Sequence, residues 1–174
     1  MDSQKWMMRL SELLSNAVNL EHQAFYFYLA AGIHFDSPAM SLLNLRDFFY
    51  GESDDELKHA RILIEFINQR GLGLKLENIA TEDLKSLSIQ EIFEKAEAFE
   101  QAVLDHYKMI QKEADEVGDY ATTQFIDYFL DKQVREVKEF HDRAMNARRC
   151  SCPLGEFIFD QSFSRKQKLK KFKQ

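Results

Sequence analysis

The chain has 174 residues, the size of one domain with a buried core, and 45% of them are apolar. With only 2 Pro and 6 Gly, the composition favours an all-α protein built from long helices. The formal net charge is −6, although the last ten residues, RKQKLKKFKQ, hold six basic side chains and no acid. The rest of the chain is therefore strongly acidic, which argues against a nucleic-acid-binding protein.

The cysteines and the N-terminus indicate the compartment. Cys150 and Cys152 stand two positions apart, too close for an ordinary structural disulfide, and the chain has no third cysteine. The N-terminal sequence MDSQKWMMRL lacks the pattern of a signal peptide. The longest nearly apolar run, AFYFYLAAGI, is about half a membrane span. We expect a cytoplasmic protein with no membrane span.

The first predicted helix covers residues 4–35, and the second ends near Gln69. The segment FDSPAM separates them, with Ser37 as the expected N-cap and Pro38 as the expected first-turn residue of the second helix. The sequence RGLG ends the second helix. A connection of roughly eighteen residues follows, which is too long for a simple turn between helices.

A second pair of helices follows this connection. Ser88 and Glu91 have the spacing of a capping box, so the third helix should begin there and continue to Val117, where GDYAT interrupts it. The fourth helix should end near Arg149, and CSCPLG separates it from a short last segment, EFIFDQSFS.

This order predicts a four-helix bundle with one long crossover and a short fifth C-terminal helix. Short loops within each half make two antiparallel hairpins, and the long connection lets the third helix run parallel to the second. We expect one domain over residues 1–164, followed by a basic, solvated tail at 165–174.

Each long helix carries an acid near its middle, close to its apolar stripe. Taken alone, each acid is best explained as a surface side chain paired with a lysine or arginine. Taken together, they offer oxygen and imidazole ligands at one depth of the bundle, which suits iron or manganese better than zinc. The residues, in chain order, are Glu21, the Glu56–His59 pair, Glu100, and the Gln133–Glu136 pair.

A weaker pattern repeats between the halves. Tyr28 follows Glu21 by seven residues, and Tyr107 follows Glu100 by the same interval. Seven residues are about two helical turns, so each pair shares a face.

These motifs resemble those of the ferritins over residues 5–163. The first-helix motif is NLEHQAFYFYLA and the second is DDELKHARIL, with NQRG at the end of that helix. The fourth helix, DYATTQFIDYFLDKQVREVKEF, resembles the bacterial-type version, and PLGEFIFDQSFS resembles the short fifth helix.

The resemblance implies an iron-storage ferroxidase, which oxidises Fe(II) with dioxygen and keeps the Fe(III) mineral inside a hollow homo-oligomer of 24 subunits. It places the first iron on Glu21, Glu56 and His59. Glu56 would bridge to a second iron. Around that second iron the resemblance places Glu100, Glu136 and the neighbouring Gln133. Tyr28 would be a hydrogen-bond donor and a one-electron donor.

The bacterial-type pattern also suggests a third iron. Its fourth-helix acids are replaced here by Lys132 and Arg135. Glu52, Asp55 and Glu136 remain as possible ligands.

Two other functions stay open at this point. One is a di-iron peroxidase or oxidase of the rubrerythrin type, which the absence of a second Glu-x-x-His and of four cysteines disfavours. The other is a structural cage subunit without an active centre, in which we would expect the ligand residues to be replaced. A DNA-protecting mini-ferritin is disfavoured because the fifth segment is present.

Overall fold

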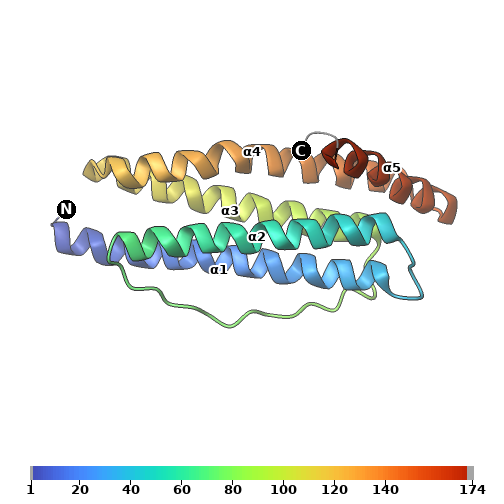
Figure 1. Ribbon diagram of the computed structural model, residues 1–174, viewed down its shortest axis with the longest axis horizontal. Coiled ribbons are helices and arrows are strands. Elements are labelled where there is room, and N and C mark those ends of the chain that lie inside the picture. Colours follow the sequence, from blue (N-terminus) through green and yellow to red (C-terminus); the bar gives the residue numbers. More distant parts are fainter. Residues whose placement is uncertain (1, 172–174) are drawn as a thin grey trace.

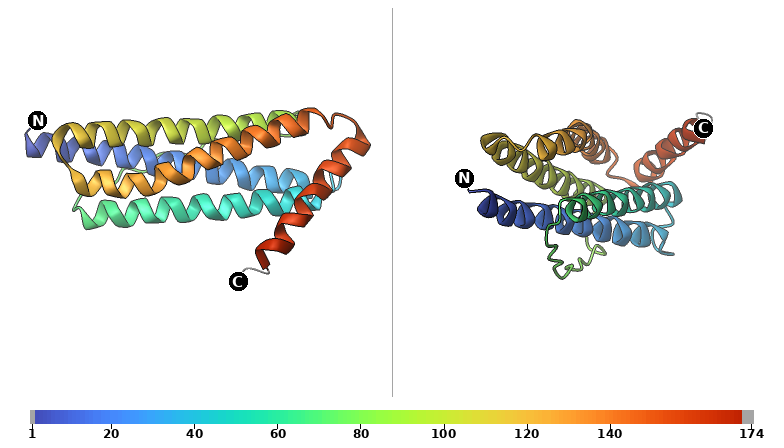
Figure 2. Two further views of the ribbon diagram at one scale, coloured as in Figure 1. Left: turned by 90° about the horizontal axis from the view of Figure 1, so that it is seen from above. Right: turned by 60° about the vertical axis from the view of Figure 1, so that its left-hand side comes forward.

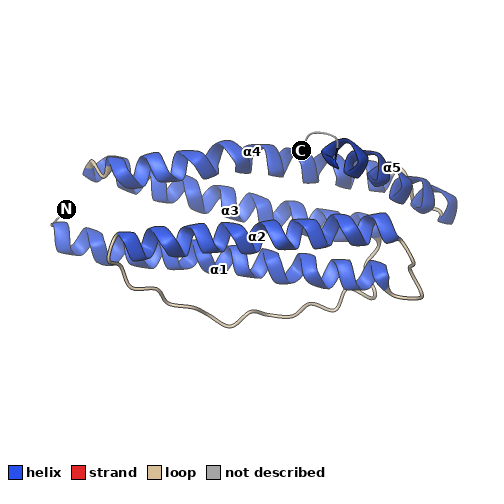
Figure 3. Cartoon of the chain, in the orientation of Figure 1, coloured by secondary structure: helices blue, strands red, loops and turns tan. Residues whose placement is uncertain are grey.

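The computed structural model describes residues 2–171, and the side chains of residues 2–164. The regular structure within this range is entirely helical (Figures 1 and 3). The helices are α1 (Ser3–Asp36), α2 (Leu43–Gln69), α3 (Ile89–Val117), α4 (Tyr120–Arg148) and α5 (Pro153–Lys171). The predicted all-α class, the four-helix bundle and the additional C-terminal helix are therefore confirmed.

The bundle consists of two antiparallel hairpins, α1 with α2 and α3 with α4, joined by the crossover at residues 70–88 (Figure 1). The crossover runs along the length of α1 and is hydrogen bonded to it. Asn19 Nδ2 donates to Lys75 O at 3.0 Å, and Asn19 Oδ1 accepts from Glu77 N at 3.0 Å. Ser15 Oγ accepts from Lys75 N at 3.1 Å. This route returns the chain to the end of the bundle where α2 began, so α3 runs parallel to α2.

The predicted cap of the second helix was wrong. Ser37 ends α1 instead of beginning α2, and Pro38 lies in a turn before α2 starts at Leu43. The connection folds back on α1, since Leu42 N donates to Phe35 O at 3.1 Å, and Ser41 adopts φ 47° to allow the turn. The capping box predicted at Ser88 and Glu91 is present, with both reciprocal hydrogen bonds.

The last helix is longer than the expected segment 156–164. It begins at Pro153, whose fixed φ suits the first turn of a helix, and it continues through good helix formers to Lys171. The expected tail, residues 165–174, overlaps its end, but the side chains of those residues lie outside the described part of the structure. Across residues 2–171, no helix has the length and apolar character needed to cross a membrane.

The apolar core is divided into two clusters. One, at the end of the bundle near α5, contains Phe35 from α1, Phe49 from α2 and Phe93 from α3. The other, at the opposite end, contains Leu14 from α1 and Leu63 from α2. On all four long helices the predicted carboxylate, amide and imidazole site residues lie between the positions that enter these two clusters, whereas Tyr28 belongs to the first cluster. A polar layer therefore separates the two halves of the core.

The fifth helix runs obliquely across the end of the bundle instead of parallel to it (Figure 2). Phe159 and Phe163 bury their rings against the first cluster. Asp160 is 3% exposed, and its carboxylate accepts from the backbone N–H groups of Asn44 and Leu45, at 3.0 and 2.9 Å. A carboxylate at this position satisfies the first N–H groups of α2 and suits the positive end of the helix dipole. Thus α5 supplies the cap that the residues preceding α2 do not.

Replacing this cap should destabilise the protein. Asp160→Ala leaves two N–H groups at the start of α2 without their acceptor, so the free energy of unfolding should fall by about 1–2 kcal/mol. Denaturant titration at one fixed protein concentration measures the change. Asp131→Ala is the matched control, because among residues 2–164 Asp131 pairs with Arg135 alone, on the exposed face of α4 at 2.7 Å. Equal stability of the two variants would contradict the capping role of Asp160.

Candidate metal centre

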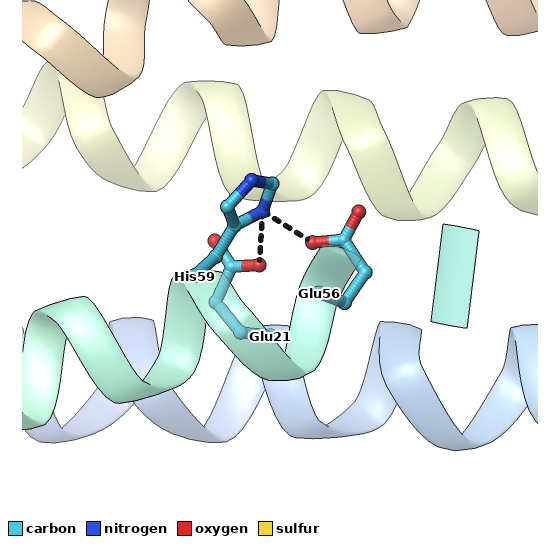
Figure 4. A group of neighbouring side chains, drawn as sticks. All are labelled: Glu21, Glu56 and His59. Atoms are coloured by element: carbon cyan, nitrogen blue, oxygen red, sulfur yellow. Dashed lines mark hydrogen bonds and ion pairs between the residues drawn. The ribbon is translucent and has the colours of Figure 1, made fainter. Parts of the chain in front are cut away.

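Three of the predicted ligands converge in the polar layer. Glu21 comes from α1, and Glu56 and His59 come from α2, one helical turn apart (Figure 4). All three are buried, and each offers one ligand atom within 4.8 Å of the other two. His59 Nδ1 lies 2.9 Å from Glu56 Oε2 and 3.4 Å from Glu21 Oε2. The imidazole nitrogen and two carboxylates therefore face a common point.

Several carboxylate oxygens of this layer have no hydrogen-bond partner among the residues that the structure describes. They are Glu21 Oε2, Glu56 Oε1 and Glu136 Oε2, all buried. A buried carboxylate oxygen without a donor is costly unless a cation or a proton compensates it. Three such atoms in one layer are therefore the expected condition of a site built for cations.

Two tyrosines cross between the halves of the bundle. Tyr28 of α1 donates to Glu100 Oε1 of α3, and Tyr107 of α3 donates to Glu21 Oε1 of α1. Burial first, and then the neighbouring carboxylates, raise the pKa of both tyrosines well above the ordinary value, so both remain donors. The two Glu–Tyr pairs spaced seven residues apart in the sequence therefore contact each other: the tyrosine of each pair donates to the glutamate of the other. Tyr107 belongs to that sequence pattern, although it is not among the predicted site residues.

Gln133 joins α4 to this network. Its Nε2 donates to the side chain of Glu100, and to the backbone carbonyl of the same residue at 3.1 Å. Burial and the charge of Glu136 raise the pKa of Glu100 to about 8, despite the donors Tyr28 and Gln133. This raised pKa favours the protonated form of Glu100 at neutral pH.

The carboxyls of Glu21 and Glu56 lie in one coupled environment. Burial and the charge of Glu21 raise the pKa of Glu56 well above its ordinary value. Burial alone would also raise the pKa of Glu21, but contacts with Glu56, His59 and Tyr107 outweigh it and hold the value below the ordinary one. The pair is consistent with an ionised Glu21 beside a protonated Glu56.

Glu136 lies at the edge of the layer, with its side chain 16% exposed, and it pairs with Lys132. In the sequence, Lys132 stands out only as a departure from the bacterial-type pattern. Lys132 Nζ is 3.0 Å from Glu136 Oε1, one turn away on α4. The same ammonium is hydrogen bonded to His59 Nε2 on α2. The i, i+4 spacing of Lys132 and Glu136 was the available signal, but it does not reveal the contact with His59.

The two remaining predicted residues lie differently. Glu52 is half-buried, and burial with repulsion from Glu136 and Glu139 raises its pKa to about 7, so it borders the layer. The Asp55 side chain is 43% exposed and pairs with Lys58 at 2.7 Å. The structure therefore brings Glu52 toward Glu136 but leaves Asp55 engaged at the surface.

Comparison with known proteins agrees with this arrangement. A family model described as the ferritin-like domain matches residues 11–150. The chain is similar to the soma ferritin of Lymnaea stagnalis, with 29% identity over 156 residues, covering 85% of this chain and 86% of that protein. It is also similar to the ferritin heavy chain of Echinococcus granulosus, with 31% identity over 150 residues, covering 85% and 87%. The bundle, its polar layer and these matches together show that the chain belongs to the ferritin family.

Proposed function

We propose that this protein is an iron-storage ferroxidase, which oxidises Fe(II) with dioxygen at a di-iron centre within each subunit and stores Fe(III) in a hollow shell. The observation that carries the proposal is the polar layer itself. Carboxylates and an imidazole from four helices meet between two apolar clusters, with three buried carboxylate oxygens left without donors. Carboxylate and imidazole ligands suit iron, and family membership supports iron as the substrate.

Two irons would share the bridging carboxylate of Glu56. The first would be bound by Glu21 Oε2, Glu56 and His59 Nδ1, the atoms that already face a common point. The second would be bound by Glu56, Glu100 and Glu136. Occupation by a second cation would compensate the unpartnered oxygens Glu56 Oε1 and Glu136 Oε2. A third ion near Glu52 and Asp55 remains a prediction.

The surrounding side chains orient the ligands. Tyr107 holds one oxygen of Glu21, which leaves Oε2 for the metal, and Tyr28 and Gln133 hold the carboxylate of Glu100. Two Fe(II) supply two electrons, which with two protons reduce dioxygen to the level of hydrogen peroxide and leave two Fe(III). Tyr28 contacts the proposed ligand Glu100, and its role as a one-electron donor stays a prediction.

We further propose a cytoplasmic shell of 24 identical subunits. The fifth helix is present, and the matches to the two ferritins cover 85% of the chain. A rubrerythrin-type peroxidase would present a second histidine where α4 carries Glu136, which argues against that alternative.

The shell is tested by its mass. Sedimentation of the purified chain should give a single particle of about 24 subunits. In a closed symmetric shell every subunit makes the same contacts, so no interface stays open to add further subunits. Electron microscopy should show a hollow interior. A dimer or a dodecamer as the main species would contradict the proposed shell without bearing on the metal centre.

The centre is tested at its bridging ligand. Glu56→Ala should slow oxidation of the first two Fe(II) per subunit by at least about tenfold, because Glu56 contributes to both metal positions. His59→Ala should weaken mainly the first iron, and Glu136→Ala mainly the second. Stopped-flow ferric absorbance after mixing anaerobically loaded protein with oxygen measures each rate.

The matched control is Glu65→Ala, an exposed acid farther along the same helix. It should leave the rate unchanged. Glu56→Ala should fold and be at least as stable as the parent, since it removes a buried acid from a repulsive cluster. If Glu56→Ala oxidises iron at the parental rate, then the subunit lacks the proposed centre, as a purely structural cage would.

Metal binding should release protons and strengthen as pH rises. Glu100, with its pKa raised to about 8, is protonated at neutral pH in the metal-free protein and must lose that proton to bind a metal. The apparent affinity for Zn(II), a redox-inert probe, should therefore rise from pH 6 to about 8. Calorimetry in buffers of different ionisation enthalpy counts the protons. Glu100→Gln should release about one proton fewer per chain at pH 7, and an unchanged count would contradict the assignment.

A further inference from the structure

Lys132 brings a positive charge into the polar layer. Its side chain is 34% exposed and extends from α4 toward α2. The ammonium is hydrogen bonded to His59 Nε2 and lies 3.0 Å from Glu136 Oε1. It therefore contacts one proposed ligand of the first iron and one of the second, although the proposed chemistry assigns it no role.

We propose that Lys132 is a tethered cation of the metal-free centre, which competes with the entering metal and is displaced when the centre fills. This inference rests on the proposed di-iron centre and adds a residue that controls its occupation. Lys132 is a positioning residue in this scheme: it holds His59 and Glu136 until metal binds.

The charge balance of the layer supports this role. Glu21, Glu56 and Glu100 are buried and Glu136 borders them, in a region of low dielectric where negative charges repel one another strongly. An ammonium on Glu136 relieves part of that repulsion without a bound ion. A divalent cation supplies the same compensation more strongly, and it is repelled by the ammonium it approaches. The two cations therefore exclude each other.

The hydrogen bonds of His59 lead to the same conclusion. In the metal-free protein Nε2 accepts from Lys132, so the ring hydrogen lies on Nδ1, toward Glu56 and Glu21. A metal on Nδ1 needs the lone pair of that nitrogen. The neutral ring then carries its hydrogen on Nε2, where it would face the N–H groups of Lys132. Two donors cannot share a hydrogen bond, so the ammonium has to leave Nε2.

After displacement, the ammonium of Lys132 can move toward Asp55 at the surface. Asp55 on α2 attracts it electrostatically and lies at the surface, where its carboxylate already pairs with Lys58. The lysine stem is flexible, and its head is partly in water before any movement. One movement of this side chain thus frees both Glu136 and Nε2 of His59. The same ammonium pairs with Glu136, one of the acids that a third ion would need.

Zn(II) binding tests the competition. Calorimetric titration of the metal-free, assembled protein should show that Lys132→Leu binds Zn(II) at least about tenfold more tightly than the parent, because a competing positive charge is gone. Lys138→Leu is the matched control. Lys138 occupies the same helix and pairs with Asp142 at the same i, i+4 spacing, but it has no contact with the metal ligands among the described residues. Its affinity should equal that of the parent.

A chemical footprint tests the displacement without activity. With an amine-acylating reagent and mass spectrometry, Lys132 should react at least about threefold faster when Zn(II) is bound, because it has left its partners. Lys138 should react equally in both states. In Glu56→Ala, Zn(II) should leave the reactivity of Lys132 unchanged.

The outcomes separate this inference from the proposed function. If Glu56→Ala abolishes Zn(II) binding while Lys132→Leu binds as the parent does, or more weakly, then the centre exists and Lys132 does not compete for it. Slower labelling of Lys132 in the presence of Zn(II) would also overturn the displacement. If Glu56→Ala binds Zn(II) as the parent does, the centre itself is wrong, and the inference falls with it.

Discussion

The burial of several carboxyl groups at one level of an apolar bundle is the constraint on which the rest of this structure depends. Glu21, Glu56 and Glu100 are each at most 2% exposed, with apolar clusters on both sides along the bundle axis. Ionised carboxylates in such a position are strongly unfavourable without partners. The protein compensates them with donors from facing helices, with raised pKa values and with one ammonium group.

This compensation requires the helices to keep a fixed register. Tyr28 and Tyr107 each reach an acid on the other helix, so a shift of α1 against α3 by one turn would break both hydrogen bonds. The crossover helps to prevent such a shift, because its backbone is bonded to Asn19, two residues before Glu21. At one end of the bundle, Asp160 of α5 attaches that helix to the start of α2. Elements far from the polar layer therefore help to hold its geometry.

The negative charge of the buried carboxyl groups is compensated differently with and without bound metal. Without metal, the raised pKa values of Glu56 and Glu100 favour protons on these acids, and the ammonium of Lys132 offsets charge on Glu136. In the proposed loaded state, two cations replace them. A bundle that folds without metal and still binds it must hold compensating groups that can leave, and protons and a flexible lysine meet that requirement better than rigid ion pairs between short side chains.

The number of long helices and their order follow from the sequence alone, which also offers the candidate ligands that remain predictions. Long stretches without breakers, the capping box at Ser88 and the length of the crossover predict the bundle, because these are local properties of the backbone. Because each long helix carries an acid near its middle, the sequence also predicts a polar layer at that level of the bundle. The cap of α2, the reciprocal tyrosine contacts between α1 and α3, and the contact of Lys132 with His59 become visible only in the folded chain. Each of these joins residues at least 70 positions apart, and such pairings depend on how helices pack in three dimensions rather than on spacing along the chain.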